Sequence, residues 1–248
     1  MWTEDREGVL KRGNEIVSIL NQLSVPKSSE ALGEELDEPL VNAAIENFKS
    51  AFNETTGAFG SGPNFPRAVH VAFLIRSSAP KTLDSGKRNA AREMALASLD
   101  AIIRRGINDH IGGGFHRYTV DREWQLPHFE KILYDQGNLI DALLEAWRAT
   151  SEQRCRKAVF DTCSYLMRAS GGFCSAEDAE SYESETREKK SEGTFFIWSL
   201  AQAQEALGDG NLLAMASAYY GIRANGNAPR VSSSSEALDG YNILRVEK

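Results

Sequence analysis

Three of the four histidines in this sequence, His110, His116 and His128, fall between positions 110 and 128, and two carboxylates, Glu130 and Asp135, follow them closely. An imidazole held in one tautomer by a carboxylate is a common general acid or base near neutral pH. We therefore take His116 and His128 as the candidate catalytic acid and base, with Glu130 or Asp135 orienting one of the two rings.

The same segment contains side chains that bind polar ligands. Arg117 can anchor a carboxylate or hydroxyl through forked hydrogen bonds. Tyr118 and Trp124 offer flat faces that pack on sugar rings or other amphipathic molecules. These three residues are the candidates for substrate binding within this segment.

A helix beginning near Pro127 would place His128, Lys131 and Asp135 along one face. His128 would then lie at the helix N-terminus, where the dipole lowers the pKa of an imidazole and favours a neutral base. The structural alternatives are a Lys131–Asp135 ion pair between successive turns and histidines that only cap turns or fill the core. The spacing of His116 and His128 matches no common metal motif, so we predict neither a metal nor a cofactor.

A repeated glycine–aromatic pattern indicates how these residues are positioned. Gly57-Ala58-Phe59, Gly113-Gly114-Phe115 and Gly171-Gly172-Phe173 are separated by 115 − 59 = 56 and 173 − 115 = 58 residues, and each interval contains two helical segments. Such a period predicts repeated helical hairpins, which curve into solenoids or close into toroids. Glu177 and Asp178 occupy the place in their repeat that His116 and Arg117 occupy in theirs, which adds two substrate-binding candidates in the same cavity.

Hydrophobic periodicity predicts mostly helices, at about 10–23, 37–52, 69–75, 89–105, 127–149, 154–169, 199–207 and 212–220. We expect loops at 77–87, 177–193 and 225–240, where polar, charged or small residues dominate. Two short apolar stretches, 194–198 and 241–244, are typical of strands.

The bulk composition excludes several classes of protein. A net charge of −7 spread along 248 residues provides no basic stripe for nucleic acid, and no apolar run is long enough to span a membrane. The N-terminus is charged and resembles no signal peptide. The odd number of cysteines (three), without a C-x-x-C motif, favours a reducing compartment, and we expect a cytoplasmic protein.

Several motifs together resemble the spermatogenesis-associated protein 20 family. They are residues 114–118 (GFHRY), 127–131 (PHFEK), 133–136 (LYDQ), 171–179 (GGFCSAEDA) and 192–198 (EGTFFIW), together with Gly57-Ala58-Phe59 and Phe65-Pro66. Members of that family carry an N-terminal thioredoxin-like domain followed by a six-hairpin (α/α) toroid, which resembles the N-acylglucosamine and cellobiose 2-epimerases and the six-hairpin glycosidases. The resemblance implies an all-α partial toroid over 1–248, with a leading helix in 1–36 and hairpins in 37–248. It also implies that the chain starts after the thioredoxin-like domain and stops near the middle of the toroid, and that full-length relatives are cytoplasmic or mitochondrial.

Two functions follow from these expectations. The first is a carbohydrate-binding or carbohydrate-converting fragment, similar to an epimerase, an isomerase or a glycosidase, that works by acid/base chemistry and is inactive alone. The second is a non-catalytic scaffold or redox-partner module that docks the thioredoxin-like domain. The sequence also departs from the family at Asn64, where members usually carry lysine before Phe65-Pro66.

Overall fold

The computed structural model describes residues 2, 4–24, 38–79, 84–168, 172–182, 189–208, 210–229 and 238–247. The chain divides into two compact units, Met1–Val41 and Asn42–Lys248. The first unit contains helix α1 (Arg6–Ser24), whose apolar side chains at Ile16, Val17 and Leu20 are exposed. Helix α2 (Glu38–Ala51) begins with Glu38 and Pro39, close to the start at about 37 that the sequence predicts.

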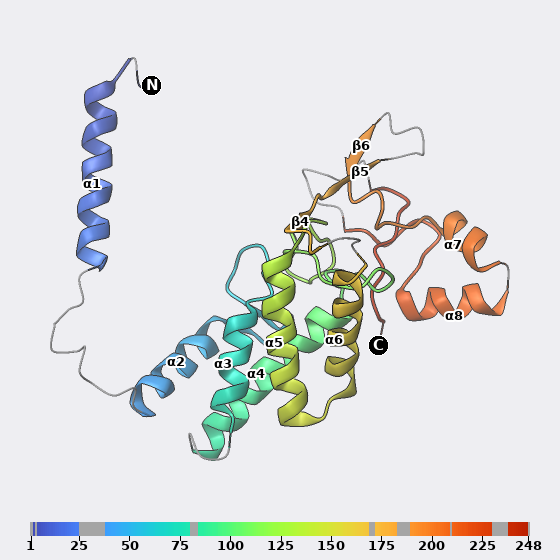
Figure 1. Cartoon of the computed structure of the whole chain (residues 1–248), viewed down its shortest axis with the longest axis horizontal. Coiled ribbons are helices and arrows are strands. Elements are labelled where there is room, and N and C mark those ends of the chain that lie inside the picture. Colours follow the sequence, from blue (N-terminus) through green and yellow to red (C-terminus); the bar gives the residue numbers. More distant parts are fainter. Residues whose placement is uncertain are drawn as a thin grey trace. The chain divides into compact units, whose positions relative to one another are not determined.

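Two helical hairpins form the core of the second unit. Helix α3 (Ala68–Ser77) packs against α4 (Ser85–Arg104) and α5 (Leu133–Thr150), and α5 packs against α6 (Gln153–Leu166) (Figure 1). Asp84 caps α4 by accepting hydrogen bonds from the backbone N–H groups of residues 86 and 87. Apolar side chains on the facing sides of these helices are fully buried and hold the hairpins together. The largest of them are Leu74, Leu99, Ile102, Leu139 and Leu143.

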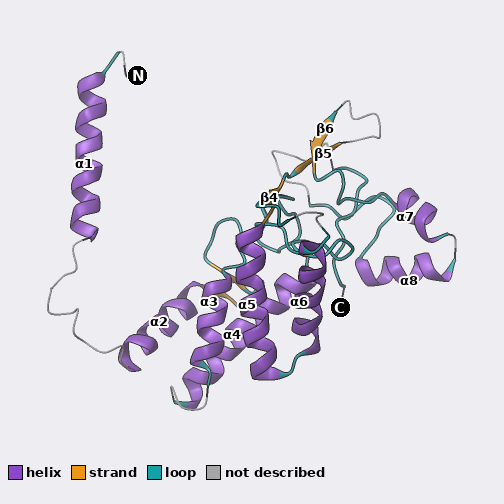
Figure 2. Cartoon of the chain, in the orientation of Figure 1, coloured by secondary structure: helices purple, strands orange, loops and turns teal. Residues whose placement is uncertain are grey.

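Short strands connect the loops rather than building a large sheet. Three antiparallel pairs occur: β1 (Phe52–Asn53) with β2 (Ala58–Phe59), β3 (Lys131–Ile132) with β4 (Ala176–Glu177), and β5 (Glu180–Tyr182) with β6 (Lys190–Glu192) (Figure 2). The predicted loop at 177–193 is therefore wrong in part. The strands predicted at 194–198 and 241–244 reduce to a single bridge between Trp198 and Asn242, in which each backbone N–H bonds the other carbonyl.

The last two helices are α7 (Leu200–Leu207) and α8 (Asn211–Tyr220). Ser199 starts α7 with a capping box: its hydroxyl accepts from the backbone N–H of Gln202, whose side chain accepts from the backbone N–H of Ser199. The described residues thus contain eight helices and only two-stranded sheets, which confirms the mostly helical fold class. No helix among them is both long and apolar enough to cross a membrane.

The loops that carry the repeated glycines lie side by side at one end of the two hairpins (Figure 1). Asn64, in the first loop, exchanges two backbone hydrogen bonds of 3.0 Å with Thr119 in the second. The second loop in turn meets the third, since the backbone N–H of Leu133 donates to the carbonyl of Ser175 (2.9 Å) and β3 pairs with β4. The three loops therefore form a common rim at this end of the hairpins, and Gly171 lies outside the described residues.

Helix α5 begins six residues later than the sequence predicts. The chain from Pro127 to Lys131 is not helical: the backbone N–H of His128 donates to the Tyr118 carbonyl (2.9 Å), and Phe129 has a φ of 37°. Lys131 then pairs with Glu177 in the β3–β4 ladder. The predicted helix face shared by His128, Lys131 and Asp135 is therefore wrong, because only Asp135 is on the helix.

Candidate functional site

A tight turn after α4 forms the floor of the candidate site. The Asp109 carboxylate accepts hydrogen bonds from the backbone N–H groups of Ile111 (3.1 Å) and Gly112 (2.7 Å). Gly113 and Gly114 follow with φ values of 77° and 76°, which side chains rarely tolerate. A Cβ on Gly113 would lie 2.5 Å from a backbone oxygen of α6, so glycine lets the turn contact that helix directly.

Gln136 fixes the chain as it leaves this turn. Its side chain is fully buried in the first turn of α5. The amide oxygen accepts from the backbone N–H of Phe115 (2.8 Å), and the amide nitrogen donates to the Phe115 carbonyl (2.6 Å). Both backbone groups are thereby satisfied inside the protein, and the adjacent residue, His116, is held in a set orientation.

A buried ion pair lies beside the turn. The Lys131 ammonium donates to the Asp109 carboxylate (2.7 Å) and to the Gly113 carbonyl (2.9 Å), and the two side chains are only 2% and 11% exposed. The same ammonium lies 4.4 Å from the ring centroid of Tyr165 and 4.9 Å from that of Phe196. Burial by itself would raise the pKa of Asp109, but the contact with Lys131 holds this pKa below its ordinary value.

His116 lies next to this pair and is 2% exposed. Its pKa falls to about 3, chiefly because burial disfavours the imidazolium and secondarily because Lys131 is near. The ring meets Phe129 and Phe196 edge-on, at centroid distances of 5.3 and 4.7 Å, and its Nδ1 has no hydrogen-bond partner. A buried nitrogen without a hydrogen-bond partner is costly, and this unsatisfied Nδ1 distinguishes His116 from the other polar groups of the turn.

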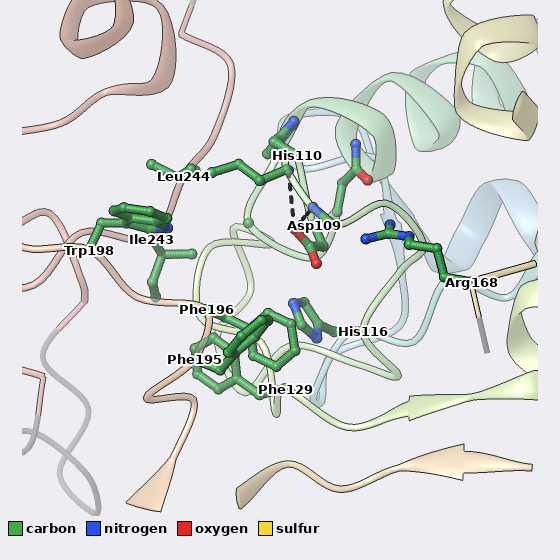
Figure 3. A pocket seen from close by; sticks show the side chains of 14 residues that line it. Asp109, His110, His116, Phe129, Arg168, Phe195, Phe196, Trp198, Ile243 and Leu244 are labelled. Carbon is green, nitrogen blue, oxygen red and sulfur yellow. Dashed lines mark hydrogen bonds between the residues drawn. The ribbon is translucent and has the colours of Figure 1, made fainter. Parts of the chain in front are cut away.

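His116 and Asp109 line a cavity of about 410 Å³ (Figure 3). Its walls come from segments far apart in the sequence: the 105–116 turn, Phe129, Arg168 at the end of α6, and the apolar and aromatic residues Phe195, Phe196, Trp198, Ile243 and Leu244. A second cavity of about 350 Å³, lined by Lys131, Tyr165, Cys174 and Glu177, adjoins it. The two share Asp109, Gly112, Arg168, Phe195 and Phe196.

His128 does not share this cavity. Its Nδ1 lies 2.8 Å from the Glu192 carboxylate on β6, and its ring stacks on Tyr118 at a centroid distance of 5.0 Å. Tyr118 in turn stacks on Phe65 at 4.8 Å. The prediction that His116 and His128 face one concavity and work as an acid/base couple is therefore wrong. The carboxylate that meets His128 is Glu192, and neither Glu130 nor Asp135 orients it.

The other predicted catalytic residues lie apart from the His116 cavity as well. Glu130 forms an ion pair with Arg117 (3.1 Å), whose guanidinium also donates to the Tyr134 hydroxyl (3.2 Å). Asp135 lines a separate cavity of about 470 Å³ with Phe65–His70, Asn138 and Leu139. Burial raises the pKa of Asp135, and one of its oxygens has no hydrogen-bond partner. The predicted Lys131–Asp135 ion pair is replaced by Lys131–Asp109.

Of the predicted substrate-binding residues Trp124, Glu177 and Asp178, only Glu177 lines one of the two adjoining cavities. Trp124 is 1% exposed and its ring N–H donates to the Thr56 carbonyl (2.9 Å), so its face is covered by the protein and a stacking role is wrong. Glu177 lines the second cavity, where its carboxylate accepts from the Tyr165 hydroxyl (2.8 Å). Asp178 is exposed and lies 3.9 Å from the Lys190 ammonium, outside both adjoining cavities.

The sequence reasoning missed the partners of His116. Asp109 could have been found from the sequence, because it stands three residues before Gly112, the first glycine of the turn, and a carboxylate there commonly closes a turn on backbone N–H groups. Arg168 and Phe195 carry no local signal, since only the packing of α6 and the 189–198 segment against the turn brings them to the cavity. Among the described residues no cluster of three or more His, Cys, Asp or Glu side chains could hold a metal ion.

The fold and the site define a helical-hairpin protein with a buried Lys–Asp pair and a neutral histidine at its loop end. The chain is similar in sequence to spermatogenesis-associated protein 20. It is 30% identical to the human protein over 99% of this chain and 34% identical to the mouse protein over 82% of this chain. An uncharacterized protein of Caenorhabditis elegans is 32% identical over 98% of this chain. This similarity confirms the family resemblance that the motifs predict. The chain spans about a third of the length of the human and Caenorhabditis elegans proteins and 27% of the mouse protein.

No family model matches the chain. Among solved structures, a sugar epimerase from a ruminal bacterium superposes with a TM-score of 0.46 at 16% identity, over 54% of this chain and 37% of the epimerase. A likeness of this size carries no conclusion about the complete fold or the reaction.

Proposed function

We propose that the cavity between the Asp109–Gly114 turn and the 195–198 segment binds a small polyhydroxylated molecule, with His116 as the acid/base group. The observation that supports this most directly is the buried, neutral His116 with an unpartnered Nδ1, on the wall of a cavity of about 410 Å³. A cavity of this size, mostly apolar and with a few convergent polar groups, is typical of small-molecule sites.

The chemistry of the walls suits a carbohydrate. The aromatic side chains of Phe129, Phe195 and Phe196 provide faces and edges against which the C–H side of a sugar ring can pack. A neutral imidazole can take a proton from a hydroxyl or carbon acid and return it. The Asp109–Lys131 pair holds one cation close to the ring, which favours the neutral form of His116 at rest.

The proposal also includes the fold of the longer protein. We take the two hairpins as part of an (α/α) toroid, in which the rim carrying the glycine turns faces the ligand. The thioredoxin-like domain that the family resemblance implies would be a partner of this chain, which makes docking of that domain the competing function of the rim. If the rim docks that domain instead, Asp109, Lys131 and His116 would only stabilise the fold.

Isothermal titration calorimetry with a panel of monosaccharides tests the proposal on the chain of residues 1–248. We expect at least one sugar to bind the wild-type protein and His116→Gln to weaken that binding by about tenfold, the effect of losing one well-placed hydrogen bond. His70→Gln is the matched control, because His70 also has an unpartnered buried Nδ1 but lines a different cavity.

Unfolding measurements on the same variants separate the two functions. Binding that disappears in His116→Gln while the free energy of unfolding is unchanged supports a ligand site. A loss of stability without any sugar binding in the wild-type protein would instead favour the docking scaffold. If His70→Gln and His116→Gln weaken sugar binding equally, the cavity lined by His116 is not the binding site.

A further inference from the structure

Arg168 occupies the place where the two adjoining cavities meet. It follows α6, and it lines both cavities together with Asp109, Phe195 and Phe196. Figure 3 shows its side chain directed inward, toward the space between Asp109 and His116. The Arg168 guanidinium and His116 therefore line the same cavity.

Among the described residues, two charged side chains that line the cavities have no oppositely charged group in contact, Arg168 and Glu177. Asp109 and Lys131 neutralise each other in direct contact. Glu177 accepts from the Tyr165 hydroxyl and lines only the second cavity. Within the described part of the chain the Arg168 guanidinium forms no ion pair and donates no hydrogen bond, and its ring contact is Tyr165, at 5.9 Å. The first cavity is therefore lined by an exposed cation whose N–H donors no other group of the described chain accepts.

We propose that the ligand of the first cavity is an acidic sugar, whose carboxylate or phosphate binds Arg168 while its ring packs near Phe195 and a hydroxyl meets His116. This inference rests on the proposed function and names its substrate class. A guanidinium fork matches the two oxygens of a carboxylate or phosphate, which neutral hydroxyls match less well. Glu177 would repel the anion from the second cavity, and that repulsion leaves the Arg168 side of the first cavity as its place.

The location of the anion has a consequence for the acid/base step. A negative group held beside His116 stabilises the imidazolium, so the bound ligand would raise the pKa of a ring that is kept neutral in the free protein. An acidic substrate would thereby make His116 a stronger base only when it is bound. A neutral sugar in the same place would leave the ring unable to hold a proton near neutral pH.

Calorimetry with matched ligands tests the proposal. Glucose, galactose and mannose are each compared with the corresponding uronate and 6-phosphate, against the wild type, Arg168→Gln and the control Arg156→Gln, which alters an exposed arginine of α6 at neither cavity. We expect an acidic form to bind the wild type about tenfold or more tightly than its neutral partner, from charge-assisted hydrogen bonds. Arg168→Gln should abolish that preference, and Arg156→Gln should keep it.

The outcomes are distinguishable. Preference for uronate alone identifies a carboxylate ligand, and preference for the 6-phosphate alone identifies a phosphate ligand; both support the proposal. Equal binding of neutral and acidic forms, or a preference that survives Arg168→Gln, overturns the acidic-sugar inference and leaves the proposed function standing. No binding of any sugar overturns both.

Discussion

Replacing Lys131 by methionine removes one half of the buried ion pair while keeping a side chain of similar length. Asp109 then remains 11% exposed, with a negative charge next to apolar and aromatic groups and no cation in contact. Removing one partner of a buried pair typically costs about 3–5 kcal/mol, because the other charge stays buried and uncompensated. The cation–π contacts with Tyr165 and Phe196 are lost as well. We therefore expect Lys131→Met to lower the free energy of unfolding by about 3–5 kcal/mol at pH 7.

The double variant Asp109→Asn with Lys131→Met is the critical control. An asparagine at position 109 still offers an oxygen to the backbone N–H groups of Ile111 and Gly112, so the turn is kept while both charges are removed. Swapping both partners of a buried pair for neutral groups is often near neutral in stability. The double variant should thus recover most of the loss.

Urea denaturation followed by tryptophan fluorescence measures these changes as shifts in the midpoint. The pH dependence adds a second check. Because the pKa of Asp109 in the folded protein is below its ordinary value of 3.8, the pair stabilises the wild type fully above that value, and this stabilisation is lost as the pH falls through the lower folded-state pKa. A single Lys131→Met variant within about 1 kcal/mol of the wild type, below the expected loss of a buried pair, would refute this reasoning, as would a double variant less stable than the single one.

Three further predictions concern the turn and the histidine. Gly114→Ala should lower the free energy of unfolding by about 2–4 kcal/mol, because φ is 76° and the added Cβ would crowd its neighbours. The control Gly137→Ala lies in open space on α5 and should raise the free energy of unfolding by about 1 kcal/mol. Urea midpoints that shift in the same direction for both variants would contradict this prediction. Gln136→Leu should cost about 2–4 kcal/mol in the same assay by leaving the N–H and carbonyl of Phe115 unpaired. Because folding lowers the pKa of His116 from 6.5 to about 3, wild-type stability should rise with pH across that window, and His116→Gln should flatten the rise in pH-resolved melts.

The helices were predictable from the sequence because their signals are local. The local signals are the Glu38-Pro39 start of α2, the Ser199 cap of α7 and the apolar spacing in α4 and α6, and each depends on residues within a turn or two. The glycine repeat also marked turns that contact a helix backbone closely, because Gly57 lies against α4 and Gly113 against α6, whereas Gly172 lies in open space.

The start of α5 and the partners of the site were not predictable in the same way. Residues 127–132 have a helical pattern, but their backbone forms hydrogen bonds with Tyr118 and with β4 instead. Such long-range hydrogen bonds cannot be predicted from the neighbouring residues in the sequence. The error moved Lys131 from an ion pair with Asp135 to one with Asp109, and it separated His128 from His116. A correct list of reactive residues therefore gave an incorrect constellation, because tertiary packing decided which of them share a cavity.

The protonation and ligand response of His116 test the central claim most directly. Long-range proton–nitrogen NMR spectra of the imidazoles, assigned with His116→Gln, can be recorded from pH 7 down to pH 4.5 with and without the sugars and sugar acids. The ring of His116 should stay neutral throughout that range in the free protein, and its nitrogen shifts should move when a sugar acid binds while those of His70 do not. A His116 that titrates near the ordinary value of 6.5, or that ignores every ligand bound by the protein, would contradict a neutral acid/base group in the binding cavity.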